Sequence, residues 1–456
     1  MKSISKIMIN IIFFGFILFS TRFALGSDLQ IEDIKTPGGI NVWFVQEESL
    51  PIVSVSLIFR GGSSLDPDTK EGLAVMVSSL IDEGAGDLNS YEFQKKLSDL
   101  SISLSFDSDR DSFSASLKTL RSHYKEAFKL LGLSLNKPRF DDEPVSRIKN
   151  QIMLKLKMDA ADPDRIASKL WFQKAFVNHQ YSKSLYGSQE SIRDISVNDM
   201  RKFVAQRFCL DNLIISVVGD ISESELIHVV DQNLAMLPNC NFNYVRNSIK
   251  LLNSGIYLEK KPLPQSTIFF GQKGVMRDDP DYFGLRMLNY IIGGGGFVSR
   301  LTKEIREKEG LAYSIYSYLL SLNDVGIIYG GVATRNDQVP QVIGKIKSEW
   351  KKFSEGKISE SEAQQAKDFL IGSFPLSLTS RDRIANLLTS MQYHELGANY
   401  LKNRAKLIDS VTIQDLKRIA KKIYKSDNLL FVIVGDPQDL SLIHISEPTR
   451  RYAISY

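Results

Sequence analysis

The feature that most constrains the fold is a repeat between the two halves of the 456-residue chain. Residues 211–220 read DNLIISVVGD and residues 427–436 read DNLLFVIVGD, so six of the ten positions are identical at an offset of 216 residues. The segments before them, VNDMRKFVAQRF and IQDLKRIAKKIY, align at the same offset. A duplicated domain explains these matches most economically, and the length suits two domains of about 200 residues. Further upstream, Asp66, Gly72 and Leu73 match Asp278, Gly284 and Leu285 at an offset of 212.

Both halves run from strands through helices to a closing strand. Apolar patterns predict strands at residues 40–46, 52–60 and 213–218, and within 101–116. Helical periodicity predicts helices at residues 72–81, 90–100, 120–135, 142–158, 164–175, 197–207 and 224–237. We therefore expect an α+β fold of two duplicated domains, each an antiparallel sheet packed against helices. The expected boundaries are 28–240 for the first domain, 241–255 for a polar linker and 256–439 for the second domain.

Residues 1–26 have the composition of a secretory signal peptide. Lys2 and Lys6 precede an apolar run at residues 7–20, and small residues at 24–26 fit a signal-peptidase site. We expect export to the periplasm, with no membrane association after cleavage. The alternative is an uncleaved membrane anchor, although the run is short for a span of about 20 residues.

Residues 440–456 do not look like part of the fold, and they contribute to the net charge of the chain. Residues 440–456 include LSLIHISEPTR, which matches the in-frame translation of a transposase sequencing adapter, so we interpret them as a non-native tail and exclude His444 as a site residue. The net charge of +4 comes from three cationic side chains in the leader and a net single charge in the tail. The remaining chain is neutral, which gives no electrostatic reason to expect a nucleic-acid partner.

The chain contains two cysteines, Cys209 and Cys240, and no CxxC motif. A chain of this size does not depend on a disulfide framework for its stability. We expect both thiols to remain unpaired, with a disulfide in an oxidising compartment as the alternative.

Residues 291–331 combine a glycine run with polar side chains on two elements. The glycines lead into a charged amphipathic segment at residues 299–309. Gly310 fits a residue that ends a helix in the left-handed region, and a β-rich run follows at 311–320. Arg306 then lies on the last helical turn and Tyr313 on the next strand, so the two side chains can converge on one point. The glycine run consists of Gly293, Gly294, Gly295 and Gly296.

The sequence GGGFVSRLTKEIREKEGLAYSIYS resembles the C-terminal-domain signature of the M16 metallopeptidases, the insulinase, pitrilysin and processing-peptidase family, and its M16B type in particular. The resemblance covers nearly all of residues 30–438 and implies that family's two-domain fold. It also implies that Arg306 and Tyr313 hold substrate and the reacting carbonyl, and that the glycine run is a flexible, substrate-binding edge. The structural alternative makes Arg306 a solvated helix residue and Tyr313 a core residue of its strand.

The same resemblance places a zinc site where this chain lacks the residues for it. M16 peptidases carry two histidines and a glutamate base as HxxEH on one helix, and catalytic zinc needs three protein ligands and an activated water. The matching ligand positions are Val75 and Ser79, the base position is Ser78, and the third ligand falls near Lys155. Valine has no lone pair, serine is a poor ligand and a weak base, and a lysine cation repels zinc. We expect no metal or other cofactor on this chain.

No other motif replaces the zinc site. His123, His179, His228 and His394 are isolated, without HxxxH spacing. The glycine run follows a helix rather than a strand, and the chain has no GxGxxG or GKS sequence, which argues against a phosphate-binding loop.

The two halves therefore imply different parts of one reaction. Hydrolysis builds negative charge on the carbonyl oxygen, which a guanidinium and a phenol can stabilise from outside the metal shell. Some M16 relatives are heterodimers in which one subunit holds zinc and the other holds the arginine–tyrosine pair. We expect a non-catalytic, substrate-positioning subunit of a periplasmic M16B-type zinc endopeptidase, inactive alone, with zinc on an HxxEH-containing partner and peptides or unfolded proteins as substrates. The alternatives are a proteolytically inactive scaffold subunit and a stand-alone peptide-binding protein.

Overall fold

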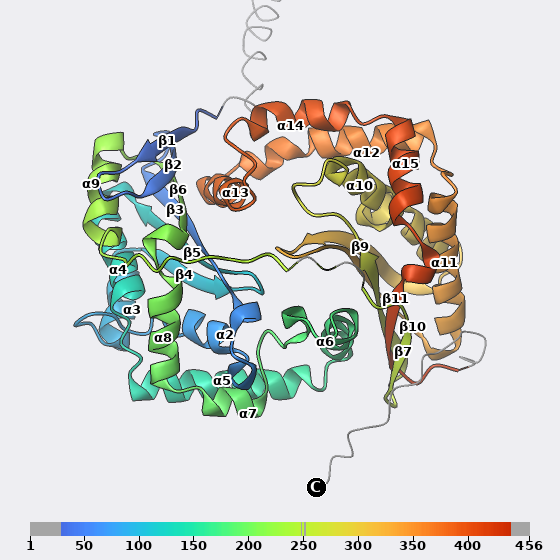
Figure 1. The fold of residues 1–456 in the computed structure, drawn as a ribbon, viewed down its shortest axis with the longest axis horizontal. Helices are drawn as coiled ribbons and strands as arrows, with labels where there is room; N and C mark the ends of the chain where they lie inside the picture. Colours follow the sequence, from blue (N-terminus) through green and yellow to red (C-terminus); the bar gives the residue numbers. More distant parts are fainter. Residues whose placement is uncertain (1–28, 248, 250–251, 439–456) are drawn as a thin grey trace, which may run out of the picture.

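The computed structural model describes residues 29–247, 249 and 252–438, and the expected leader and tail lie outside them. Two sheets stand on opposite sides of the molecule, and the helices α6 (Pro163–Ala175) and α13 (Arg381–Tyr393) lie between them (Figure 1). Among the helices that the structure describes, none is long and apolar enough to cross a membrane.

The first half confirms the predicted order of strands and helices. Its strands are β1 (Glu32–Lys35), β2 (Asn41–Gln46), β3 (Ile52–Arg60), β4 (Ser103–Ser108), β5 (Ser112–Leu120) and β6 (Leu213–Gly219). Its other helices are α2 (Leu73–Ser78), α3 (Ser90–Asp99), α4 (Tyr124–Asn136), α5 (Asp142–Asp159), α7 (Gln189–Asp194), α8 (Val197–Arg207) and α9 (Glu223–Leu234). We predicted neither β1 nor the short helix α7; β1 reads EDIK and buries only Ile34, so it lacks an apolar alternation.

The second half follows the expected linker. Its strands are β7 (Gly255–Lys260), β8 (Gln265–Lys273), β9 (Ala312–Ser321), β10 (Gly326–Arg335) and β11 (Leu430–Gly435). Its other α-helices are α10 (Tyr282–Asn289), α11 (Val339–Ser354), α12 (Glu360–Gly372), α14 (Tyr400–Asp409) and α15 (Ile413–Ile423). Two segments are π-helical: η6 (Tyr290–Gly294), which includes the first two glycines of the run, and η8 (Thr302–Glu307), which follows the run.

The strand order repeats between the two sheets, which confirms the duplication. The six-stranded sheet has the order β1-β2-β6-β3-β5-β4, and the five-stranded sheet has the order β7-β11-β8-β10-β9. Strands β2 to β6 thus correspond to β7 to β11. In both sheets the closing strand runs parallel to the first strand of the repeat and antiparallel to the second. Each sheet is therefore mixed, with one parallel pair, rather than wholly antiparallel as we expected.

The helix before each closing strand also begins in the same way. Ser196 precedes α8 and accepts a hydrogen bond from the Asp199 N–H at 3.2 Å, while Thr412 precedes α15 and accepts one from the Asp415 N–H at 3.1 Å. The acidic side chain bonds back to the cap residue in both cases, which forms a capping box. These pairs lie at the 216-residue offset, so the repeat extends to the local signals that start a helix.

Each sheet is covered on its second face by a helix from the opposite half. Helix α6 packs on the five-stranded sheet, where the Trp171 indole N–H donates to the Leu430 carbonyl at 3.2 Å. Helix α13 packs on the six-stranded sheet, where the Thr389 hydroxyl donates to the Ser56 carbonyl at 3.2 Å. Because both helices bury apolar residues against the other half, the two halves are interlocked.

The two halves also meet at equivalent hairpin turns, β4–β5 and β9–β10. Asp111 in the first turn accepts hydrogen bonds from the Tyr181 hydroxyl at 2.7 Å and from the Asn323 N–H of the second turn at 2.9 Å. The buried Asp324 carboxylate accepts from the Tyr244 hydroxyl at 3.0 Å and from the backbone N–H of Asn247. The segment that we predicted as a linker is thereby fastened to the β9–β10 turn.

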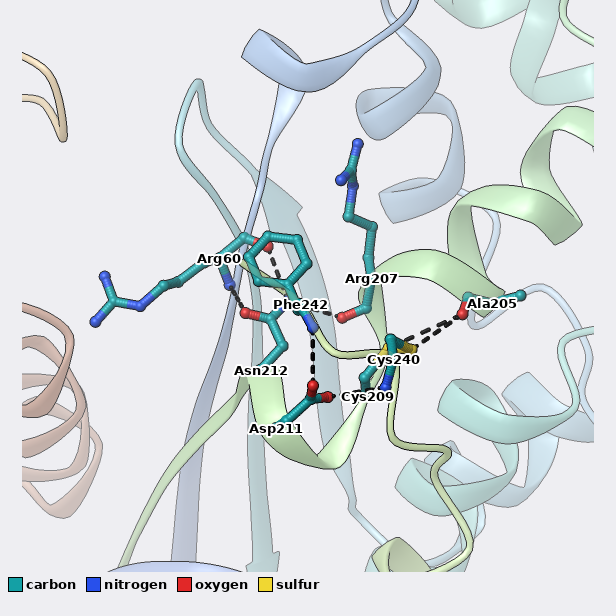
Figure 2. Close-up of a disulfide and its surroundings, with 8 residues drawn as sticks. All are labelled: Arg60, Ala205, Arg207, Cys209, Asp211, Asn212, Cys240 and Phe242. Carbon is teal, nitrogen blue, oxygen red and sulfur yellow. Dashed lines mark hydrogen bonds between the residues drawn. A yellow bond between two sulfur atoms is a disulfide. The ribbon is translucent and has the colours of Figure 1, made fainter. Parts of the chain in front are cut away.

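Our prediction that Cys209 and Cys240 remain unpaired is wrong, because a disulfide joins them (Figure 2). The Asp211 carboxylate accepts the backbone N–H groups of Cys240 at 3.1 Å and Phe242 at 2.8 Å, which folds the segment after α9 onto the end of α8. This brings the two cysteine Cα atoms to 5.7 Å, within the usual range for a disulfide. A sequence separation of 31 residues did not reveal this proximity.

Candidate functional site

The chain reverses direction sharply between Arg306 and Tyr313. Segment η8 is π-helical, and the Lys308 N–H donates to the Lys303 carbonyl at 3.0 Å. Gly310 adopts φ +61°, the left-handed conformation expected from the sequence, and its N–H donates to the Arg306 carbonyl at 3.1 Å. Strand β9 begins two residues later, so Arg306 and Tyr313 come from consecutive elements on either side of this turn.

The Arg306 and Tyr313 side chains do converge. The Arg306 guanidinium carbon lies 5.3 Å from the centroid of the Tyr313 ring and 4.7 Å from the centroid of the Phe297 ring. Cation–π attraction of this kind orients a guanidinium without using its N–H donors. In the part of the chain that the structure describes, no carboxylate forms an ion pair with Arg306, so its donors stay available for a ligand.

The pair stands at the open surface of the isolated chain rather than inside an enclosed cavity. Tyr313 is 86% exposed and Phe297 is 65% exposed, so Tyr313 is not a core residue of its strand. A reaction centre that uses this pair therefore needs a second surface to exclude water from it.

The glycine run is explained in part by close packing. A Cβ atom at Gly293 would lie 2.5 Å from the Ser317 hydroxyl, and one at Gly294 would lie 2.7 Å from the Asn289 amide nitrogen. One at Gly295 would lie 2.7 Å from the Tyr290 carbonyl oxygen, and Gly296 adopts φ +59°. The run thus lets η6 approach β9 closely, while its role as a flexible, substrate-binding edge stays a prediction.

Two features that support this site were not found from the sequence. Asn289 and Ser317 form a buried pair, in which the Ser317 hydroxyl donates to Asn289 Oδ1 at 2.9 Å and Asn289 Nδ2 donates to the Ser317 carbonyl at 3.1 Å. This pair ties α10 to β9. Phe297, which stacks on Arg306, follows Gly296 directly in GGGFVSR, and that position was the only signal for it.

The positions that we predicted to correspond to the family's zinc site carry side chains that do not suit the metal. Val75 and Ser78 are buried in α2, and Ser79 follows it. The Ser78 and Ser79 hydroxyls both donate to the Val75 carbonyl, at 3.0 and 2.9 Å, so they satisfy the end of their own helix. On α5, Lys155 Nζ bonds to the Asp159 carboxylate at 3.0 Å and lies 4.5 Å from the Tyr186 ring centroid. These four positions therefore do not supply the donor set that zinc requires.

One group of potential metal ligands occurs elsewhere in the described residues, formed by Cys209, Asp211 and Cys240. Its two sulfur atoms are bonded to each other in the disulfide, so they are not thiolate ligands. The described histidines do not cluster. His123 Nδ1 bonds to the Leu100 carbonyl, and His179 Nε2 faces the Asp324 carboxylate.

The segment that leads into α2 is nevertheless held in place by hydrogen bonds to Asp66. The Asp66 carboxylate accepts the N–H groups of Gly72 at 3.0 Å and Ala74 at 3.2 Å, and Gly72 adopts φ +91°. A Cβ at Gly72 would lie 2.8 Å from the Tyr186 carbonyl oxygen, so glycine is required here. Burial raises the pKa of Asp66 to about 7, against the opposing effect of these hydrogen bonds. The start of α2 is therefore held in place, although Val75 and Ser79 are not metal ligands.

The fold defines a duplicated, two-domain α+β protein. Sequence comparison gives the family: residues 42–189 match "Insulinase (Peptidase family M16)" and residues 194–370 match "Peptidase M16 inactive domain". The chain belongs to the M16 peptidase family, as we predicted from the segment around Arg306 and Tyr313.

Three similar proteins illustrate this membership of the M16 family. The non-peptidase homologue YmxG of Helicobacter pylori is 26% identical over 410 residues, covering 89% of this chain and 93% of that protein. The "Uncharacterized zinc protease YmxG" of Bacillus subtilis is 26% identical over 325 residues, covering 69% of this chain and 76% of that protein. The crystal structure of a peptidase M16 inactive domain from Pseudomonas fluorescens has 26% identity and a TM-score of 0.85, covering 92% of this chain and all of that one.

Proposed function

We propose that this chain is the non-catalytic, substrate-positioning subunit of an exported, M16B-type zinc endopeptidase heterodimer. Its partner is an M16 chain that carries HxxEH and holds the zinc ion. The substrates are peptides or unfolded proteins. The relatives' names, a non-peptidase homologue and an inactive domain, support a chain that is inactive alone.

The observation that carries this proposal is the contrast between the two halves. The Arg306 guanidinium is stacked beside Tyr313 without a carboxylate partner in the described chain, while the hydroxyls of Ser78 and Ser79 are used within α2. These α2 positions thus do not supply a metal site for activating water, and the second half offers two hydrogen-bond donors at an open surface.

The two donors suit the charge that peptide hydrolysis creates. As water attacks a peptide carbonyl, negative charge develops on its oxygen, and the Arg306 N–H groups and the Tyr313 hydroxyl donate hydrogen bonds to it. Removing one such donor from an enzyme typically lowers kcat by about 10²–10³. Zinc on the partner, when bound, supplies the activated water. Because Tyr313 is exposed, the partner's surface is needed to close the site.

A sheet edge lies beside the pair and supports peptides as the substrate class, although Asn289 and the glycine run already cover it at Ser317. Strand β9 is the terminal strand of its sheet, so one side of it pairs with β10 while the backbone groups of the other side have no strand partner in the sheet. An extended peptide can add to such an edge through main-chain hydrogen bonds, largely independently of its sequence. Tyr313 then stands at the start of the bound segment.

Export is supported by the disulfide, since structural disulfides persist mainly in oxidising compartments. It agrees with the signal-peptide composition of residues 1–26.

The proposal is tested by isolating the complex from the native host with an affinity tag on this chain. We expect mass spectrometry to find an HxxEH-containing M16 chain in stoichiometric amount, with one zinc ion per heterodimer. The chain alone should bind no stoichiometric zinc and cleave no peptide, and activity should appear when the partner is added. A zinc-loaded or active isolated chain would refute the proposal, as would a complex without an M16 partner.

A further inference from the structure

A pocket with a volume of about 380 Å³ lies where the two halves meet, and we call it the seam pocket. The glycine run does not line it, and different parts of the chain supply its polar lining. These side chains are Arg60 at the end of β3, Arg246 in the linker, Arg277 after β8, Asn323 in the β9–β10 turn and His394 after α13.

Arg277 carries a charge that the protein does not neutralise directly. Its guanidinium carbon lies 4.1 Å from the Tyr282 ring centroid and 5.1 Å from the Tyr400 ring centroid, and it donates a hydrogen bond to the Tyr400 hydroxyl. Within the described chain, no carboxylate lies at ion-pair distance from this guanidinium. Its position is therefore fixed by aromatic rings while its charge stays uncompensated.

Two further polar groups in the lining have unused hydrogen-bonding capacity. Asn323 Oδ1 accepts the Tyr393 hydroxyl at 2.9 Å, which leaves Asn323 Nδ2 buried without an acceptor. The His394 ring packs edge-on against the Tyr393 ring, and no hydrogen bond joins it to a residue that the structure describes. Unsatisfied donors that converge on one pocket call for an acceptor that the protein does not supply.

Two carboxylates, Asp278 and Glu395, also line the pocket. Asp278 pairs with Arg246 at 3.2 Å, with both side chains about half exposed, and Glu395, which is 85% exposed, lies 3.5 Å from Arg60. Solvent screens these pairs, so they offset little of the positive potential in the pocket.

The positive surroundings of the pocket also act on the His394 imidazole. Burial, and then the positive charges of Arg277 and Arg60, lower the pKa of His394 to about 4, with Arg246 acting in the same direction and Asp278 in the opposite one. A neutral imidazole in a positive field can donate its N–H to an anion.

We propose that the seam pocket binds a small oxyanion, a phosphate or a carboxylate group, between Arg277 and His394. A guanidinium pairs with such a group through two parallel N–H donors, and the pocket volume suits a small ligand. Arg277 and His394 both belong to the second half, and Arg60 of the first half lines the same pocket. This inference does not depend on the proposed peptidase role.

Calorimetric titration of the whole chain with inorganic phosphate, and separately with acetate, tests the proposal at constant ionic strength in chloride. We expect saturable binding of at least one of them, and the anion that binds identifies the ligand class. The affinity should fall at least tenfold in Arg277→Gln and should be unchanged in Arg335→Gln, a matched loss of charge at an exposed arginine paired with Asp337. No saturable binding of either anion, or equal losses in both variants, would overturn the proposal.

The His394 imidazole gives a readout that needs no variant of Arg277. Its proton signals, assigned with His394→Gln, should titrate at a higher pH when the anion is bound, because a nearby negative charge favours the imidazolium form. His228 serves as the control, since it lies on α9 away from the pocket. An unchanged His394 titration at saturating anion would contradict binding at this place.

Discussion

The contact between the two hairpin turns makes the stability of this protein depend on pH. Asp111 is buried, and its carboxylate is held by the Tyr181 hydroxyl and the Asn323 N–H rather than by a cation. Burial raises the pKa of Asp111 from 3.8 to about 7, and the charges of Asp109 and Asp324 act in the same direction. The folded state therefore holds a proton on Asp111 that the unfolded chain has released.

The sign and size of the effect follow from this difference. Because the folded pKa is raised, the stabilisation is complete below pH 4 and is lost as the pH rises through 7. The difference of about three pKa units corresponds to about 4 kcal/mol, of which about 3 kcal/mol falls between pH 5 and pH 8. Asp111→Asn keeps the shape of the side chain and cannot ionise. Its stability relative to the wild type should therefore rise by about 3 kcal/mol over the same interval.

Urea unfolding at pH 5 and pH 8, at one ionic strength, measures this change. Burial also raises the pKa of Asp66 and Asp82, so the wild type loses further stability that the comparison cancels. Asp337→Asn is the control, because Asp337 is exposed and its pKa is lowered by Arg335, so it should show no such rise. A difference between Asp111→Asn and the wild type that stays constant from pH 5 to pH 8 would refute the reasoning.

Two other predictions concern the fold. Replacing both Cys209 and Cys240 with serine opens a loop of 31 residues and should lower the free energy of unfolding by about 3–4 kcal/mol, measured by urea unfolding; an unchanged midpoint would show that the disulfide does not constrain the chain. Gly293→Ala should destabilise the protein by more than about 1 kcal/mol, because its Cβ would lie 2.5 Å from the Ser317 hydroxyl, whereas Gly344→Ala in α11 has open space and should stabilise it slightly. Equal thermal midpoints for these two alanine variants would contradict the packing role of Gly293.

The sequence predicted the architecture well because the repeat carries topological information. Two segments that match over a closing strand and the helix before it imply the same strand order in each half, and the sheets have that order. The Ser196 and Thr412 caps explain why the matched helices begin where they do. The parallel pairing of each closing strand was not predicted, since an apolar strand pattern does not specify the direction of its neighbour.

Long-range relations were the part that the sequence could not supply. The apolar face of α6 predicts a buried helix, but not that its Trp171 packs on the sheet of the other half. The same limit explains the error about Cys209 and Cys240, whose proximity depends on the Asp211 hydrogen bonds to the following segment.

In the candidate site, one contact could be predicted from the sequence and another could not. Gly310, with its left-handed conformation, made the meeting of Arg306 and Tyr313 predictable from a local signal. The Phe297 ring on the other side of Arg306 depends on how η6 packs against β9, so no local pattern identified it.

The most direct test of the central claim is the rate of peptide cleavage by the heterodimer reconstituted with Tyr313→Phe. This change removes one hydroxyl and keeps the ring that stacks on Arg306. The account predicts that kcat falls at least tenfold, which is about 1.4 kcal/mol of transition-state stabilisation, while Arg335→Gln leaves it unchanged. A wild-type kcat in the Tyr313→Phe complex would contradict the claim that this chain contributes to the reaction of its partner.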